Sequence, residues 1–193
     1  MTKVKTVTAA MIIIGDEILS GRTKDANLNH LSLWLNRVGV QLREVRVIPD
    51  VGEVIQSTVN TLRRQCDYVF TTGGIGPTHD DITAENIAKA FKVPFVQSAE
   101  SLALLHKYYG NETISDARLR MTMIPEGAGL IKNPVSMAPG FQMENVFVMA
   151  GIPVVMQSML LDLEKRIFGG DKMLSKAIHV FEGESHLPKC WSR

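Results

Sequence analysis

The amino-terminal half of the chain alternates between two patterns of hydrophobic residues. Apolar runs typical of buried strands occur in segments 4–14 and 68–70, and segment 40–48 is predicted as a further strand between them. After each segment, apolar residues recur every three or four positions, which predicts helices near 28–38, 54–62 and 83–91. Asp25 or Asn27 is the expected cap of the first helix, and Gly39 its end. Three strand–helix units in succession predict a parallel sheet with right-handed crossovers.

The carboxyl-terminal half shows shorter patterns. They predict strands near 93–96, 130–131, 141–143 and 146–149, and helices near 101–109, 116–121 and 154–168. A turn is expected at Ile124–Gly127, a hairpin connection at Glu144-Asn145, and a further strand near 177–181. The predicted fold is α/β, a three-layer α/β/α sandwich with a mostly parallel central sheet plus a small β-hairpin element. It occupies residues 1–170, and residues 171–193 are expected to form a loosely ordered tail.

Composition narrows the class of protein. A chain of 193 residues with 45% hydrophobic and 21% charged residues suits one globular domain. The net charge of +1 gives no electrostatic reason to expect nucleic acid or a membrane as a partner. Cys66 and Cys190 lack the spacing of a disulfide framework or a zinc site. The first apolar run is cut off by Gly15-Asp16-Glu17 without a cleavage site, so we expect a cytoplasmic protein.

The segment from Thr71 to Thr83 carries the strongest chemical signal. A strand, a glycine-rich loop and a helix follow one another, an arrangement in which backbone N–H groups converge on an anion. A plain strand-to-helix turn that needs glycines is the alternative. Hydroxyl and carboxylate side chains in the loop favour a ligand site. The residues expected to bind a ligand here are Thr72, Gly73, Gly74, Gly76, Pro77, Thr78 and Asp80, together with Asp81.

Two other acidic segments follow strands of the same predicted sheet. Gly15, Asp16 and Glu17 come after the first strand, and Asp50 comes after the second. Ligands of parallel sheets bind beyond the carboxyl ends of the strands, so we expect these residues at one edge with the glycine loop. Asp50 and Asp81 could then share a divalent cation or orient a phosphate oxygen. Capping of the second helix is an equal interpretation of Asp50.

Several familiar motifs are excluded. The glycine loop has neither the G-x-G-x-x-G spacing of dinucleotide sites nor the Gly-Lys-Ser/Thr of a P-loop. No G-x-S-x-G elbow or H-E-x-x-H helix occurs. His79 could contact a phosphate, although an incidental loop position is the better interpretation.

The sequence resembles a known family over about residues 5–168. Thr71-Thr-Gly-Gly-Ile-Gly-Pro-Thr-His-Asp-Asp-Ile-Thr83 is similar to the signature of the molybdopterin-binding (MoaB/Mog-like) domain family. Further segments resemble in particular the amino-terminal domain of CinA-type competence/damage-inducible proteins. These segments are 14–21, Asn27, 49–50, 138–141 and 151–153.

The resemblance implies a site and its ligands. It implies binding of a phosphate-bearing pterin or nucleotide, with Asp50 and Asp81 as the catalytic and metal-binding pair. In the loop 133–140, Ser136, Pro139 and Gly140 are expected to contact the ligand. Family members form homo-oligomers, which we expect here too. The chain departs from the family pattern at Ile75, where many relatives have Thr, and at Val154-Val155, where Ser-Glu is frequent.

Three functions compete. The first is a metal-dependent pyrophosphatase (a hydrolase) that acts on a dinucleotide such as ADP-ribose. The second is molybdopterin binding and adenylylation in molybdenum cofactor biosynthesis. The third is a non-catalytic module that binds a pterin or nucleotide. The cofactors implied are a divalent metal, Mg²⁺ or similar, and molybdopterin as a ligand.

Overall fold

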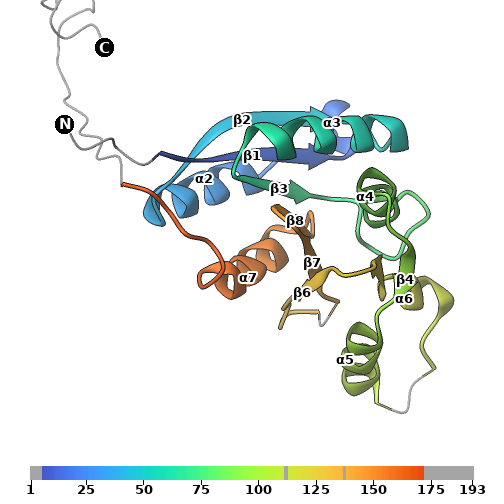
Figure 1. The fold of residues 1–193 in the computed structure, drawn as a ribbon. Coiled ribbons are helices and arrows are strands. Elements are labelled where there is room, and N and C mark those ends of the chain that lie inside the picture. Colours follow the sequence, from blue (N-terminus) through green and yellow to red (C-terminus); the bar gives the residue numbers. More distant parts are fainter. Residues whose placement is uncertain (1–5, 111–112, 137, 172–193) are drawn as a thin grey trace, which may run out of the picture.

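The computed structural model describes residues 6–110, 113–136 and 138–171. Its centre is a six-stranded mixed sheet with the order β2-β1-β3-β8-β7-β6 (Figure 1). Four neighbouring strands are parallel, and β7 and β6 add antiparallel strands at one edge. The strands of this sheet are β1 (Val7–Ile14), β2 (Val40–Ile48), β3 (Tyr68–Thr72), β6 (Gly129–Ile131), β7 (Gly140–Met143) and β8 (Val146–Met149).

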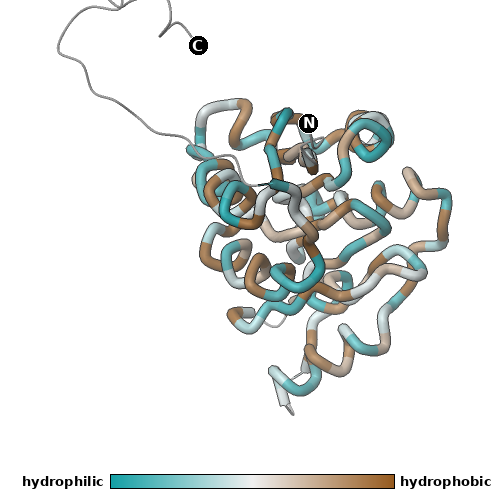
Figure 2. The backbone as a smooth tube through the Cα atoms, turned by 60° about the vertical axis from the view of Figure 1, so that its left-hand side comes forward, coloured by the Kyte–Doolittle hydropathy of each residue, from teal (hydrophilic) through white to brown (hydrophobic). Residues whose placement is uncertain are grey.

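Strand β1 shows why two helical layers are required. Its side chains alternate between two hydrophobic clusters, with Met11 and Ile13 in one and Ile12 and Ile14 in the other. Helices α2 (Asn27–Arg37) and α7 (Pro153–Leu163) supply the first cluster, and α3 (Gly52–Gln65) and α4 (Thr83–Phe91) supply the second. Figure 2 shows hydrophobic and hydrophilic residues alternating along the coils of the backbone. The three-layer α/β/α sandwich predicted from the sequence is confirmed.

A side-chain hydrogen bond explains where α2 starts. Asp25 caps α2, because its Oδ2 accepts the Leu28 N–H at 2.8 Å. The alternative cap, Asn27, is wrong: its amide instead donates to the Gly151 carbonyl at 2.7 Å. A short helix, α1 (Asp16–Leu19), follows β1 and was not predicted, since it buries no residue and has no hydrophobic pattern.

Residues 95–125 build a separate unit beside α4, which we call the α5–α6 lobe (Figure 1). It contains β4 (Phe95–Gln97), α5 (Ala99–Tyr109), α6 (Asp116–Arg120) and β5 (Met123–Pro125). The strands β4 and β5 pair antiparallel with each other, outside the main sheet. The turn expected at Ile124–Gly127 is therefore wrong at its start, where Ile124 and Pro125 are paired in β5.

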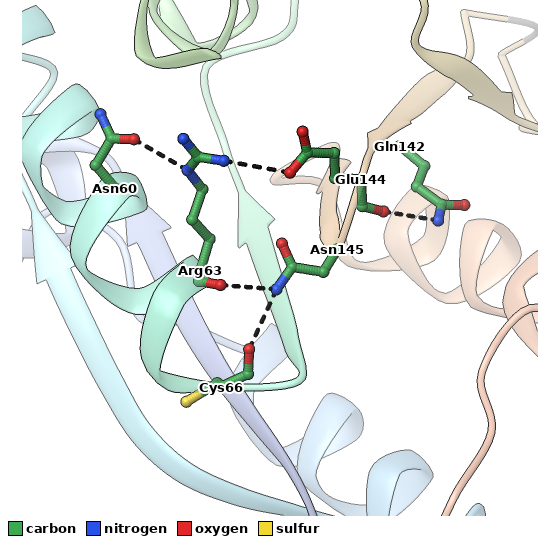
Figure 3. A network of polar contacts seen from close by, with 6 residues as sticks. All are labelled: Asn60, Arg63, Cys66, Gln142, Glu144 and Asn145. Atoms are coloured by element: carbon green, nitrogen blue, oxygen red, sulfur yellow. Dashed lines mark hydrogen bonds and ion pairs between the residues drawn. The ribbon is translucent and has the colours of Figure 1, made fainter.

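The predicted hairpin between β7 and β8 is confirmed, and its turn is tied to α3 (Figure 3). Glu144 has φ 51°, and the Asn145 amide donates to the carbonyls of Arg63 (2.9 Å) and Cys66 (3.1 Å). The Arg63 guanidinium lies 3.3 Å from the Glu144 carboxylate. These contacts hold β8 beside β3, so that both strands end at the same edge.

At the carboxyl-terminal end, α7 stops at Leu163, earlier than the predicted Phe168. The strand expected near 177–181 lies outside the described residues. Within the described ranges, each helix is too short or too polar to cross a bilayer.

Candidate functional site

A pocket of about 680 Å³ opens at the carboxyl ends of β1, β2, β3 and β8. Its volume is in the range of sites for small molecules. Three walls enclose it: the glycine loop after β3, the loop 133–138 with the start of α7, and the α5–α6 lobe. The sequence-predicted residues that line it are Glu17, Asp50, Gly73, Gly74, Gly76, Pro77, Asp80, Asp81 and Ser136.

Asp50 lies just beyond the carboxyl end of β2 and is hydrogen-bonded to the first residue of α1. Its Oδ2 accepts the backbone N–H of Asp16 at 3.0 Å. Burial raises the pKa of the Asp50 carboxyl, and this hydrogen bond lowers it in part. The nearby charges of Asp16, Glu17 and Asp80 raise that pKa further. The pocket therefore concentrates negative charge that a cation would neutralise.

The glycine loop brings main-chain atoms close to neighbouring strands and to α4. Gly73 has φ 102° and Gly74 has φ 68°, conformations that side chains rarely adopt. A Cβ at Gly73 would lie 2.1 Å from the Ile14 carbonyl oxygen, and one at Gly74 would lie 2.1 Å from the Thr83 hydroxyl. Both positions therefore exclude a side chain.

The same loop leaves several N–H groups unused. The Gly73 N–H donates to the Met149 carbonyl at 3.3 Å, which anchors the loop to β8. Among the described residues, the N–H groups of Gly74, Ile75 and Gly76 donate to no backbone or side-chain acceptor. Consecutive free N–H groups beside a pocket are the donors that an anionic oxygen requires.

The two adjacent aspartates differ in their surroundings. The Asp81 Oδ2 accepts the Thr78 N–H at 2.8 Å and also the Thr78 hydroxyl, so this carboxylate closes the loop on itself. Asp80 is more exposed, with hydrogen bonding to Thr78 and to its own N–H lowering its pKa. Both carboxylates line the pocket, and the chain at residues 79–80 forms a turn instead of an extended segment.

Six predicted residues do not line the pocket: Gly15, Asp16, Thr72, Thr78, Pro139 and Gly140. Thr72 is buried inside β3, and Gly140 is buried in β7, where a Cβ would lie 2.4 Å from the Val148 carbonyl oxygen. Pro139 faces a small cavity behind the glycine loop. Thr78 and Asp16 act on the pocket through their bonds to Asp81 and Asp50. His79 has an exposed side chain away from the lining.

Two buried asparagines shape the second wall, which the loop 133–138 and the start of α7 form. Asn133 donates to the Ser136 hydroxyl at 2.6 Å and to the Ala138 carbonyl at 2.9 Å. Its own Oδ1 accepts the Val135 N–H at 3.0 Å. Asn27 ties α2 to Gly151 at the start of α7, and its Oδ1 is buried without a partner. Asn133 was missed as a site residue, because a buried side chain inside a loop leaves no periodic signal.

The lobe contributes lining residues that the sequence does not single out, Tyr109 and Met121. The local pattern identifies Tyr109 only as part of a helix, because nothing in it indicates that α5 ends beside the glycine loop.

The donor set fits a metal bound together with phosphate. In the described part of the chain, no cluster of three or more His, Cys, Asp or Glu side chains is arranged around a common metal position. Asp50 and Asp81 nevertheless line the same pocket. Mg²⁺ commonly takes one or two protein carboxylates and completes its shell with phosphate oxygens and water.

The fold and the pocket define a class: an open, mostly parallel α/β sheet with a crevice at the carboxyl ends of its strands. Comparison with known proteins gives the family. The family model "Probable molybdopterin binding domain" matches residues 10–168, and the chain belongs to this family. The resemblance inferred from the motifs is thereby confirmed.

Individual relatives agree with this assignment. A CinA-like protein of Citrifermentans bemidjiense is 36% identical over 157 residues, which are 78% of this chain but only 38% of that protein. The crystal structure of a CinA protein of unknown function from Thermoplasma acidophilum has 33% identity and a TM-score of 0.78, covering 83% of this chain and 98% of that one. The tungsten cofactor synthesizing protein MoaB of Pyrococcus furiosus has 18% identity and a TM-score of 0.55, covering 85% and 94%. The last likeness concerns the fold alone.

Proposed function

We propose that the chain binds a phosphate-bearing nucleotide or pterin in the pocket. The free N–H groups of Gly74, Ile75 and Gly76 would receive phosphate oxygens, as donors already fixed in place. The single observation that carries the proposal is the meeting of this loop with Asp50 and Asp81 in one pocket of about 680 Å³.

We further propose metal-dependent hydrolysis of a dinucleotide pyrophosphate such as ADP-ribose. Asp50 and Asp81 would hold a divalent metal, which when bound supplies positive charge to the pyrophosphate. The loop N–H groups would hold one phosphate while water attacks the other at phosphorus. The P–O–P bond then breaks, and ADP-ribose and water yield AMP and ribose 5-phosphate.

A second candidate is molybdopterin binding with adenylylation, a transferase activity. It is favoured by the molybdopterin-binding character of the family and by the fold shared with the tungsten cofactor synthesizing MoaB of Pyrococcus furiosus. It requires ATP turnover that depends on the pterin. A homo-oligomer and a cytoplasmic location remain expectations from the resemblance and the sequence.

The experiment incubates the protein with ADP-ribose and Mg²⁺, Mn²⁺ or Co²⁺ and measures AMP by chromatography. Asp81→Asn keeps an acceptor for Thr78 but removes the charge, and we expect it to lower the rate by about 100-fold or more. Asp116→Asn is the matched control, since Asp116 is exposed and does not line the pocket. Its rate should equal that of the wild type.

The other outcomes separate the functions. AMP release that Asp81→Asn leaves unchanged would overturn hydrolysis at this site. Pterin-dependent ATP turnover without AMP release from ADP-ribose would favour the transferase. A rise in Tm with ADP-ribose, without turnover under any of the metals, would leave a binding module.

A further inference from the structure

The pocket has two chemically different ends. One end carries the carboxylates of Glu17, Asp50 and Asp81 with the glycine loop, and it suits phosphate and a cation. The α5–α6 lobe adds Tyr109 and Met121 to the lining, an aromatic ring and a polarizable apolar side chain, and Met121 also lines a small cavity beside Asp81. A ligand that fills both ends must therefore be anionic at one side and apolar at the other.

The Tyr109 ring is held in a fixed orientation. Tyr109 is the last residue of α5, and the chain turns away at Gly110 with φ 59°. From α6, the Arg118 guanidinium carbon lies 4.3 Å from the centroid of the Tyr109 ring. The Ser115 hydroxyl caps α6 by accepting the Arg118 N–H at 3.4 Å, which places this arginine. Arg118 takes one face of the ring, the Tyr108 ring meets it at 90° with the centroids 5.0 Å apart, and Tyr109 also lines the pocket.

A ring oriented before the ligand arrives loses little conformational freedom on binding. Planar heteroaromatic groups stack on such rings with little dependence on their identity, since each has a π-face. Met121 beside it adapts to the outline of the bound group.

We propose that Tyr109 is a specificity-determining residue that stacks on a planar heteroaromatic ring of the ligand. This inference rests on the proposed binding of a phosphate-bearing ligand in the same pocket, and it adds the position of the ring. Adenine and pterin share this chemistry. The ligand therefore lies with its phosphate at the glycine loop and its ring against the α5–α6 lobe.

The test measures dissociation constants by calorimetry for three probes: AMP, neopterin monophosphate and inorganic pyrophosphate, each with Mg²⁺. Tyr109→Leu should raise the dissociation constant of a ring-bearing probe by about tenfold, for each such probe that the wild type binds, because one stacking contact is lost. Pyrophosphate, which has no ring, should bind Tyr109→Leu and wild type equally. Tyr109→Phe keeps the ring and should bind all probes like the wild type.

Phe168→Leu is the control for removal of an exposed aromatic ring, since Phe168 is exposed and does not line the pocket. It should leave all three affinities unchanged. Preference for AMP over neopterin monophosphate, or the reverse, identifies the source of the ring.

The inference is overturned if Tyr109→Leu leaves the ring-bearing probes unaffected, or weakens pyrophosphate to the same extent. It is also overturned if the wild type binds pyrophosphate as tightly as AMP and neopterin monophosphate. Absence of binding of any of the three probes by the wild type would instead refute the proposed function itself.

Discussion

The charged carboxylate of Asp50 lines the candidate site and also destabilises the fold. Its carboxyl is partly buried at the end of β2, next to three other acids, and burial raises its pKa. A raised pKa in the folded state means that the ionised carboxylate destabilises the fold relative to the unfolded chain. The protonated form is therefore the more stable one, and wild-type stability is lost as the pH rises through the pKa of the folded state.

We predict that Asp50→Asn is at least as stable as the wild type at pH 7. The asparagine Oδ1 can still accept the Asp16 N–H, and the unfavourable charge is gone. The advantage should shrink as the pH falls toward the ordinary value of 3.8, where the wild-type carboxyl becomes neutral as well. Urea unfolding at a series of pH values measures this. An Asp50→Asn protein that is less stable than the wild type at pH 7 would show that the charge is compensated in the fold.

At the scale of elements, the junction between the glycine loop and α4 depends on a close approach. The Thr83 N–H donates to the Gly74 carbonyl at 2.9 Å, and the buried Thr83 side chain lies against the Gly74 Cα. The first residue of α4 therefore packs against the loop that carries the free N–H groups. The geometry of the glycine loop and the start of the helix thus depend on the same contact.

Two glycines with similar backbones allow the close approach to be tested. Gly74 has φ 68° and Gly21 has φ 73°, but a Cβ at Gly21 would meet nothing within 4 Å. Gly21→Ala should cost about 1 kcal/mol from backbone strain alone. Gly74→Ala should cost more by about 1–3 kcal/mol, because its Cβ would also collide with Thr83. Denaturant unfolding of both variants gives the difference, and equal losses would contradict the role of the contact.

Sequence patterns predicted the elements whose signal is local. The strands β1 and β3 were found because they contain short continuous apolar runs, β2 was found between two predicted helices, and α4 was found with its observed bounds. The main error concerned β5, since Met123–Pro125 is too short to show a period and pairs with β4, 26 to 30 residues away. The earlier end of α7 was missed because Ile167 is apolar and buried, which continues the pattern beyond the last helical residue.

The residues that line the pocket were also predictable only where their signal is local. The acidic and glycine residues were predictable because they directly follow parallel strands, whose ends must meet at one edge. Tyr109 and Met121 were not, because their place at the pocket depends on how a whole lobe packs beside α4. Gly140, for which a family motif suggested a ligand contact, lies outside the pocket lining and packs in β7 close to the Val148 carbonyl.

In the whole molecule, the two sides of the pocket differ in how firmly they are built. The glycine loop follows a central strand of the sheet that is buried at every residue after Tyr68. In the lobe, α5 buries only Ser101 and Leu105, and α6 buries no residue. Elements with so little buried surface open locally at low cost in free energy. A ligand that contacts both sides would therefore stabilise mainly the lobe.

We predict that AMP with Mg²⁺ slows hydrogen exchange of backbone amides in residues 73–76 and in α5 and α6. The loop amides would be protected by phosphate, and the lobe by the ring stacked on Tyr109. The matched reference is the turn at Glu144-Asn145, which is tied to α3 (Figure 3), does not line the pocket, and should exchange at the same rate with and without AMP.

In Tyr109→Leu the protection of the lobe should fall while that of the loop persists at saturating AMP. Protection confined to residues 73–76 in the wild type would mean that the ligand does not reach the lobe, and protection of the reference turn to the same degree would indicate a general tightening of the fold.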